Sequence, residues 1–276
     1  MADERGAISP TWRSTHGDLS DAESGLISDL VPSYSGPGRV GRPTKWSKRD
    51  VVNAILCVAA TGCQRRALPA CYPQWNAVHR YRVTRSEDGT WEPICRRLTE
   101  LVRQREGRDP EASAGVIDAR SVRGAATVTS PTRGYDAGKQ VSGCKTFGFV
   151  DTTGLLLAVI VVAASVSDNA GGIAALARAR TRSGRLAQIF CDGGFKKAFA
   201  LACGAHHISA EVVNKIHPNR FEVLPRRWVV ERTWSWLMNN RRLQVDYERN
   251  PIVTEGFVWA AHSRLLLRRL TEPVIA

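Results

Sequence analysis

The first folded part of the chain carries apolar residues at helical spacing, and this spacing predicts three short helices. The first helix begins after Ser47, which resembles one half of a capping box with Asp50, and stops at Gly62. The second helix covers about 74–84, and the third covers Trp91–Arg105. This part of the sequence therefore predicts a small all-α domain.

The pattern changes after a polar linker at 106–115. Short apolar runs replace the helical spacing, and such runs bounded by turn residues are typical of strands. The predicted strands are 115–120, 144–151, 155–164, 186–191 and a short one at 210–213. The predicted helices are 173–182, 195–203, 225–243 and 252–270. The polar stretch 120–144 is expected to form a long loop or hairpin.

The order of these elements predicts the fold class. Three strands joined by hairpins precede a helical crossover to another strand, and a helix, a short strand and a helix follow. This is an α/β layered pattern with a mixed sheet, and it is also the order of a ribonuclease H-like domain. We expect a flexible leader over 1–40, a helical domain over 41–106 and a ribonuclease H-like domain over 113–272. The leader is rich in Ser, Gly and Pro and shows little periodicity.

Charge indicates the kind of partner. The 276 residues carry a formal net charge of +13, and the calculated pI is about 9.9. The leader contains six acids and three arginines, so the basic excess belongs to the rest of the chain. Such an excess favours a polyanionic partner, with nucleic acid first and an anionic membrane surface second.

Cysteine usage and hydropathy argue against several classes of protein. Seven scattered cysteines without a CxxC pair argue against a disulfide framework or a zinc ribbon and favour a reducing compartment. The N-terminus has no apolar segment typical of a signal peptide. The longest apolar run, Leu155–Ala164, is too short to span a bilayer. We therefore expect a soluble, cytoplasmic protein.

Three carboxylates stand out because of the elements that carry them. Asp118 and Asp192 lie at the ends of predicted strands, and Glu231 lies in the helix 225–243, which has apolar residues on nearly every face. Mg²⁺ prefers carboxylate oxygens, and two such ions can hold the attacking and leaving oxygens of a phosphoryl transfer. In a basic chain with this strand order, the three acids together favour a metal site.

Each carboxylate also has a structural explanation. Asp118 can accept a hydrogen bond at a strand end, Asp192 opens an Asp-Gly-Gly turn, and Glu231 can pair with Arg227 one turn earlier. Turn chemistry explains the other acids near the predicted strands, which are Asp136, Asp151 and Asp168.

The helical domain has two interpretations. Basic residues surround its helices, at Lys45, Lys48, Arg49, Arg65, Arg66, Arg80, Arg82 and Arg85. They are compatible with a helix-turn-helix-like DNA-binding unit, and equally with a plain helical bundle that has a solvated basic face.

A series of ordered motifs resembles the DDE-type transposases of bacterial insertion sequences, specifically the insertion-sequence five group. The motifs are GRPTKWSKRDVVNAIL, TGCQ, YPQW, GTWEPI, VIDARSVR, RGYDAGK, VDTTGLLLAVIV, SVSD, CDGGF, LPRRWVVERTWSWL and RRLQVDYER. The resemblance covers about 41–270. It implies a ribonuclease H-like catalytic domain behind an N-terminal helical domain.

The resemblance also implies an activity and its catalytic acids. By position the acids are Asp118, Asp192 and Glu231, which would bind two Mg²⁺ ions, with Mn²⁺ as a substitute. Water would attack the phosphodiester at a transposon end and free a 3′-OH, which would then attack target DNA. The partner would be double-stranded DNA, both the terminal inverted repeats and the target, in the bacterial nucleoid. A homodimer or higher oligomer would pair the two ends.

Four basic residues are candidates for DNA contact. Arg227 stands at the position of the family's arginine four residues before the catalytic glutamate, and Lys139, Lys145 and Arg123 are further candidates. The chain departs from the family after Gly143, where an Arg-Lys-Arg-His run is common and Cys144–Phe147 stands here. If that run contacts DNA phosphates, the change weakens DNA binding.

Two alternatives to an active transposase stay open. One is a metal-dependent nuclease of the same fold, which cuts DNA without joining ends. The other is a decayed or repurposed transposase that only binds DNA.

Overall fold

The computed structural model describes residues 17–33, 46–126, 128, 130–195, 197–213 and 227–272. Its helical part contains α2 (Asp21–Gly25), α3 (Lys48–Thr61), the short 3-10 helix η1 (Arg65–Ala67), α4 (Trp75–Glu87) and α5 (Trp91–Arg105). The predicted signals around α3 are confirmed, because Ser47 and Asp50 form a capping box and Gly62 ends the helix with a φ of 67°. Residue Pro225, predicted to begin a helix, lies outside the described residues.

One mixed sheet forms the second part. Its strands are β1 (Ala114–Arg123), β2 (Gly134–Asp136), β3 (Val141–Asp151), β4 (Leu156–Ala163), β5 (Gln188–Cys191) and β6 (Ser209–Val212). The order across the sheet is β2-β3-β1-β5-β6, and β4 also pairs with β3. β3 is antiparallel to β1 and β4, whereas β5 is parallel to β1 and to β6. The other helices are η2 (Ser130–Thr132), α6 (Asp168–Arg180), α7 (Lys197–Gly204), α8 (Trp228–Met238), η3 (Arg241–Leu243) and α9 (Pro251–Thr271).

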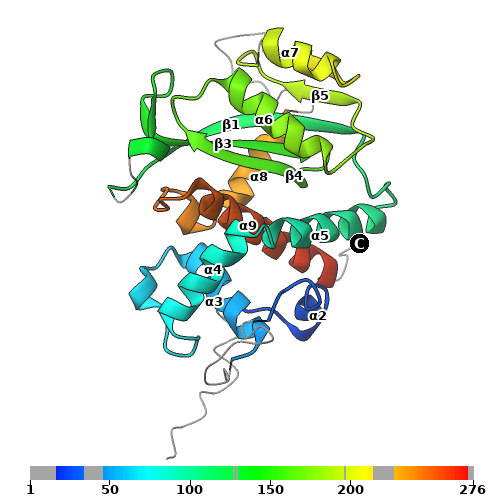
Figure 1. Cartoon of the computed structure of the whole chain (residues 1–276). Coiled ribbons are helices and arrows are strands. Elements are labelled where there is room, and N and C mark those ends of the chain that lie inside the picture. The colour runs from blue at the N-terminus through cyan, green and yellow to red at the C-terminus, as the bar shows by residue number, and fades with distance from the viewer. Residues whose placement is uncertain are drawn as a thin grey trace, which may run out of the picture.

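Helices cover both faces of the sheet (Figure 1). On one face, Phe147 and Phe149 of β3 are buried against residues of α6 and α7. On the other face, Val150 and Leu156 are buried with residues of α8 and α9. Successive strand residues point to opposite faces, so an apolar strand such as β3 contributes to both cores. The predicted α/β class with a ribonuclease H-like order of strands is confirmed.

β1 is longer than its sequence pattern indicates. We expected a loop or hairpin from residue 120, but β1 continues to Arg123 and pairs with β3 over residues 115–123. Directly opposite residues of antiparallel strands lie on the same face of the sheet. Polar residues at the end of β1 therefore lie beside polar residues of β3 and β2, so β1 can continue without burying unpaired polar groups. One result is that Asp118 lies within a strand and not at its end.

The expected flexible leader is wrong for residues 17–33. Leu19, Ile27 and Val31 are buried in the core, and α2 packs against α9. Glu23 caps α2 through Ser20 and forms an ion pair of 2.5 Å with Arg264 of α9. The Ser- and Gly-rich composition does not reveal that three apolar residues of this segment pack into the core that the helices share. Residues 1–16 and 34–40 of the expected leader lie outside the described residues.

α9 joins the helical part to the sheet. We expected an amphipathic helix, but twelve of its residues are buried. The helix lies between β4 on one side and α3, α4 and α5 on the other (Figure 1). The Nε2 atom of His262 accepts the backbone N–H of Leu156 at 3.0 Å, and Glu255 accepts the N–H of Val161 at 2.9 Å. Because His262 is fully buried, its pKa falls to about 3 and the ring stays neutral.

A buried ion pair makes a second connection between the two parts. Arg103 of α5 donates to Asp151 at the end of β3, and both side chains are almost fully buried. Asp151 also accepts the N–H groups of Thr153 and Leu155 at 2.8 and 2.9 Å. The predicted hairpin turn is confirmed, and Gly154 within it has a φ of 89°.

Among the described residues, no helix combines the length and the apolar character needed to cross a bilayer.

Candidate active site

The strand register places Asp118 beside Asp192. β1 and β5 are parallel neighbours in which Val116 pairs with Phe190. Asp118 stands two residues further along β1, and Asp192 follows Cys191, the last residue of β5, so the two aspartates lie on adjacent segments and the charge of Asp192 acts on Asp118. Both aspartates therefore lie at the carboxyl end of β5, where parallel strands commonly present functional side chains.

The indole of Trp234 orients Asp118. Its Nε1–H donates to Oδ2 of Asp118 at 3.0 Å, from α8 across the face of the sheet. Gly148 makes this contact possible, because it pairs with Asp118 on β3 and a Cβ atom there would lie 2.6 Å from the indole ring. A buried tryptophan N–H commonly finds such a partner.

We expect Gly148→Ala to destabilise the protein by about 1–3 kcal/mol, because the added methyl displaces the indole from a filled space. The same displacement lengthens the hydrogen bond from Trp234 to Asp118. Urea denaturation measures the loss of stability. Gly204→Ala is the matched control, since a Cβ at Gly204 meets nothing within 4 Å. If Gly148→Ala and Gly204→Ala unfolded at the same urea concentration, the space beside the Trp234 indole would not be filled.

The surroundings of Asp118 disfavour the ionised form of its carboxyl group. Burial first, and then the neighbouring charge of Asp192, raise the pKa of Asp118, whereas Arg227 and Lys139 act in the opposite direction. Burial also lowers the pKa of Arg120, two residues along β1, while the charge of Asp118 opposes that fall. A half-buried carboxylate beside a second carboxylate is a place where a cation is favoured.

Asp192 is held by the loop after β5. Its Oδ1 accepts the N–H of Gly194 at 2.8 Å, and Arg227 Nη2 lies 3.7 Å from its Oδ2. The Asp-Gly-Gly turn was the structural alternative for Asp192, and part of that turn is present. Gly194 is also tightly placed, because a Cβ there would lie 2.7 Å from Asp168 Oδ2 and 2.9 Å from Asp192 Oδ1. A third acid, Asp168, thus lies close to this loop.

Glu231 lies on α8, and no hydrogen bond or ion pair among the described residues involves its carboxylate. It is exposed and stands one turn before Trp234, on the helix that packs on β1 and β3. α8 buries one face only and Trp228 is 41% exposed, although apolar residues lie on nearly every face of this helix. Arg227 pairs with Asp192, and no ion pair joins it to Glu231. Within the described ranges, no group of three His, Cys, Asp or Glu side chains is assembled to hold a metal ion.

The candidate DNA-contact residues differ in accessibility. Lys139 and Arg123 are exposed, and Lys139 Nζ donates to the carbonyl of Ala119 at 2.6 Å, beside Asp118. Lys145 is only 6% exposed, and its ammonium donates to Asp168 at 3.0 Å and to the carbonyl of Val166 at 2.9 Å. Contact between Lys145 and DNA would require these bonds to open.

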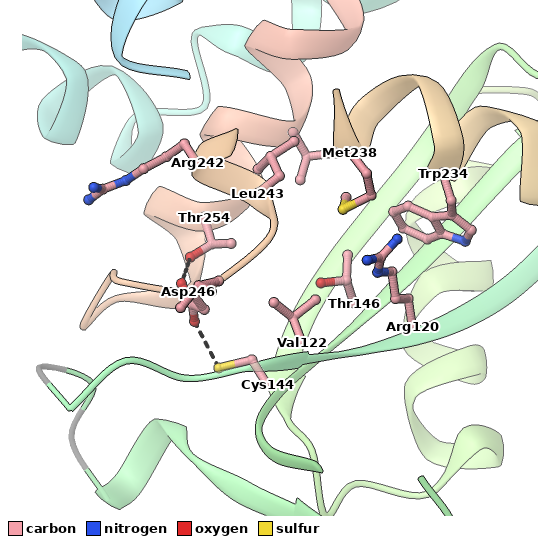
Figure 2. Close-up of a pocket in the computed structure, with 12 residues that line it drawn as sticks. Arg120, Val122, Cys144, Thr146, Trp234, Met238, Arg242, Leu243, Asp246 and Thr254 are labelled. Atoms are coloured by element: carbon pink, nitrogen blue, oxygen red, sulfur yellow. Dashed lines mark hydrogen bonds between the residues drawn. The ribbon is translucent and has the colours of Figure 1, made fainter. Parts of the chain in front are cut away.

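The stretch that departs from the family lies in the interior. Cys144 is buried, and its thiol donates to Asp246 Oδ2 at 2.9 Å, beside a pocket that Arg120, Thr146 and Trp234 also line (Figure 2). Burial and the charge of Asp246 raise the pKa of the Cys144 thiol to about 12. Asp246 also accepts the Thr254 hydroxyl at 2.8 Å. The altered residues therefore take part in core packing, and they remove no charge from the exposed surface.

Fold and site together define a class of protein. A mixed sheet with two aspartates side by side on β1 and after β5, in a strongly basic chain, is typical of ribonuclease H-like enzymes that act on nucleic acids. A family model described as a transposase DDE domain matches residues 109–266, and a model of the transposases of the IS4/5 family (DUF4096) matches residues 19–95. The chain belongs to the DDE-type transposases of the IS4/5 family. A comparison with curated proteins finds no match.

The sequence patterns did not indicate three residues of this site, namely Trp234, Gly148 and Arg120. The spacing of Trp234, three residues after Glu231, puts it on the same face of α8, and that spacing was a usable signal. Gly148 stands three residues before the hairpin turn at Asp151, and this spacing places it within β3. The pairing of Gly148 with Asp118 depends on the register between β1 and β3, which only the structure gives.

Proposed function

We propose that this transposase cleaves DNA at the ends of its element and joins the freed ends to target DNA. The observation that supports this most strongly is the placement of Asp118 on β1 beside Asp192, which directly follows the neighbouring parallel strand β5. The net charge of +13 supports a DNA partner. The helical part would bind the terminal inverted repeats, and a homodimer or higher oligomer would pair the two ends.

The donor atoms of this site fit a hard divalent cation, which transposase DDE domains generally use. Among the described donors, only the Trp234 indole hydrogen-bonds to Asp118, which is half-buried next to Asp192. Mg²⁺ usually binds through one or two carboxylates and keeps other positions for water and phosphate oxygens. We propose Asp118, Asp192 and Glu231 as ligands of two Mg²⁺ ions, which Mn²⁺ can replace. When bound, the ions stabilise charge on the phosphate and activate water.

The other residues position the reacting groups. Trp234 fixes the orientation of Asp118, and the N–H of Gly194 fixes that of Asp192. Arg227, 3.7 Å from Asp192, and the exposed Lys139 would contact DNA phosphates, as would Arg123. Water forms a bond to the phosphorus at the transposon end, the P–O3′ bond breaks, and the 3′-oxygen leaves as a hydroxyl. That hydroxyl then attacks a target phosphodiester and displaces a second 3′-oxygen.

A labelled duplex that carries the ends of the element tests the proposal. We expect the wild type to nick it in the presence of Mg²⁺ or Mn²⁺ and to join the 3′ end to a second duplex, and we expect Asp192→Ala to do neither. Nicking without joining would favour a nuclease of the same fold. End-specific binding with no nicking by either protein would favour the binding-only alternative.

A further inference from the structure

A second cluster of charged residues lies where the helical part meets the C-terminal helices, away from Asp118 and Asp192. A pocket between α3, η1, α4 and η3 is lined on its polar side by Arg65, His79, Arg82 and Arg242. Figure 2 shows the side chain of Arg242 on η3 extending away from Cys144 and Trp234, which line the other pocket. We call these four residues with Glu248 the junction cluster.

The junction cluster has more positive than negative charge. Glu248 is its one carboxylate among the described residues, and it pairs with Arg82 at 3.2 Å and with Arg242 at 2.5 Å. The three side chains of these pairs are between 5% and 11% exposed. The two buried guanidinium groups therefore share one buried carboxylate, and Arg65 adds a third, exposed guanidinium. Buried charges without full compensation are costly, and they favour a bound counter-ion.

His79 cannot satisfy both of its arginine neighbours. Its Nε2 lies 2.7 Å from Arg65 Nη1, and its Nδ1 lies 3.0 Å from Arg82 Nη2. A neutral imidazole accepts a hydrogen bond at one nitrogen only, because the other nitrogen carries a proton. Burial and the two guanidinium charges lower the pKa of His79 to about 4, which keeps the ring neutral. One of the two arginine N–H groups therefore faces an N–H group.

Further donors in the junction cluster have no acceptor. Arg82 Nη1 and Arg242 Nε are buried and without a hydrogen-bond partner among the described residues. Arg82 as a whole is 4% exposed and lines the pocket. A guanidinium donates through a planar fork that matches the oxygens of a phosphate, and a phosphate only accepts. The missing component is thus an anion with several acceptor oxygens.

We propose that the junction cluster binds one backbone phosphate of the DNA substrate. This proposal rests on the proposed function, since it takes the ligand to be DNA. The exposed side chains of Arg65, Arg66 and Trp75 at the rim give a DNA strand access to the pocket, and Arg66 stacks on Trp75 at 5.6 Å. η3 follows α8 directly, so the contact ties DNA on the helical part to the helix that carries Glu231 and Trp234.

Binding of the full-length protein to an end duplex at several salt concentrations, with EDTA present, tests this site. Each neutralised phosphate adds about 0.9 to the slope of log K against log salt. We expect Arg65→Gln and Arg242→Gln each to weaken binding about tenfold and to lower the slope by about one. The double variant should lower the slope by about one as well, because both residues act on one phosphate.

The control is Arg96→Gln, an exposed arginine of α5 that pairs with Glu100 at 3.8 Å. It should bind DNA as the wild type does, and circular dichroism should show that all variants are folded. Unchanged slopes in both junction variants would overturn the proposal, and so would losses that add to about two in the double variant. If inorganic phosphate raises the melting temperature of the wild type but not of Arg242→Gln, while DNA binding is equal, the ligand is a free phosphate instead.

Failure of this site and failure of the proposed function are distinguishable. The binding assay contains no metal and reads no cleavage. If the wild type nicks and joins DNA but Arg242→Gln keeps the full salt slope, the junction-site proposal fails and the proposed transposase activity stands. If the wild type never nicks DNA but the junction variants show the predicted losses of salt slope, the junction site stands and the proposed transposase activity fails.

Discussion

Asp118→Asn is expected to lower the rate of metal-dependent nicking about 10³-fold or more. The amide keeps the size of the side chain and its oxygen can still accept the indole N–H of Trp234. It lacks the charge that a divalent cation requires. The initial rate of nicking of a labelled end duplex, with Mg²⁺ and with Mn²⁺, measures the effect.

The same substitution is expected to raise the stability of the metal-free protein, although it lowers the rate of nicking. The pKa of Asp118 is raised in the folded protein, so its ionised form is less favourable there than in the unfolded chain. The stability that goes with the protonated form is lost as the pH rises through the folded-state pKa. A neutral amide avoids this loss, so metal-free Asp118→Asn should unfold at a higher urea concentration than the wild type at neutral pH. Added Mn²⁺ should stabilise the wild type and not the variant.

Asp109→Asn is the control for both measurements. Asp109 is an exposed acid in the segment before β1 that pairs with Arg185, so its loss should leave nicking unchanged. If Asp118→Asn retained nicking within tenfold of the wild type, Asp118 would not be a metal ligand. If Mn²⁺ stabilised the variant as much as the wild type, the ion would bind elsewhere.

Asp151→Ala is expected to destabilise the protein by about 3–5 kcal/mol, because it leaves Arg103 as an unpaired buried charge. Asp151 is fully buried, and its loss also removes the acceptor for the N–H groups of Thr153 and Leu155. Arg103→Met in the Asp151→Ala background should recover part of the loss, since no buried charge then remains. Urea denaturation of the three variants measures both effects.

The matched control is another aspartate–arginine pair that lies on the surface. Asp29 pairs with Arg97 at 2.5 Å, and the two side chains are 60% and 43% exposed. Asp29→Ala should change stability little, because water screens such a pair. Equal effects for the two alanine variants would show that burial is not the source of the stability at Asp151.

Local signals predicted much of this fold. The capping box at Ser47, the ends of the helix Trp91–Arg105 and the turn after Asp151 depend on residues that are close in sequence. The sequence shows that Asp118 and Asp192 each follow a short apolar run, but their closeness depends on the parallel pairing of β1 with β5, which the structure gives. The family resemblance is confirmed by the matching family models, while the roles of Asp118, Asp192 and Glu231 stay predictions.

The features that sequence did not predict depend on contacts between distant segments. Leu19 and Ile27 appear as isolated apolar residues in a polar leader, but in the structure they are part of the core that the helices share. Lys145 appears as a free basic residue, but Asp168 and Val166 surround its ammonium. Periodicity assigns a residue to a face of an element, and it does not reveal what covers that face.

The position of α9 has a consequence for chain synthesis. This last described helix completes the core that the N-terminal helices share with the sheet. A nascent chain that ends before Pro251 contains α2 to α5 and every described strand, yet it lacks the surface on which both parts close. We therefore expect shortened copies without α9 to be unfolded chains that proteases remove. Such copies would not release a separate DNA-binding fragment, so they would not compete with intact transposase for the ends of the element.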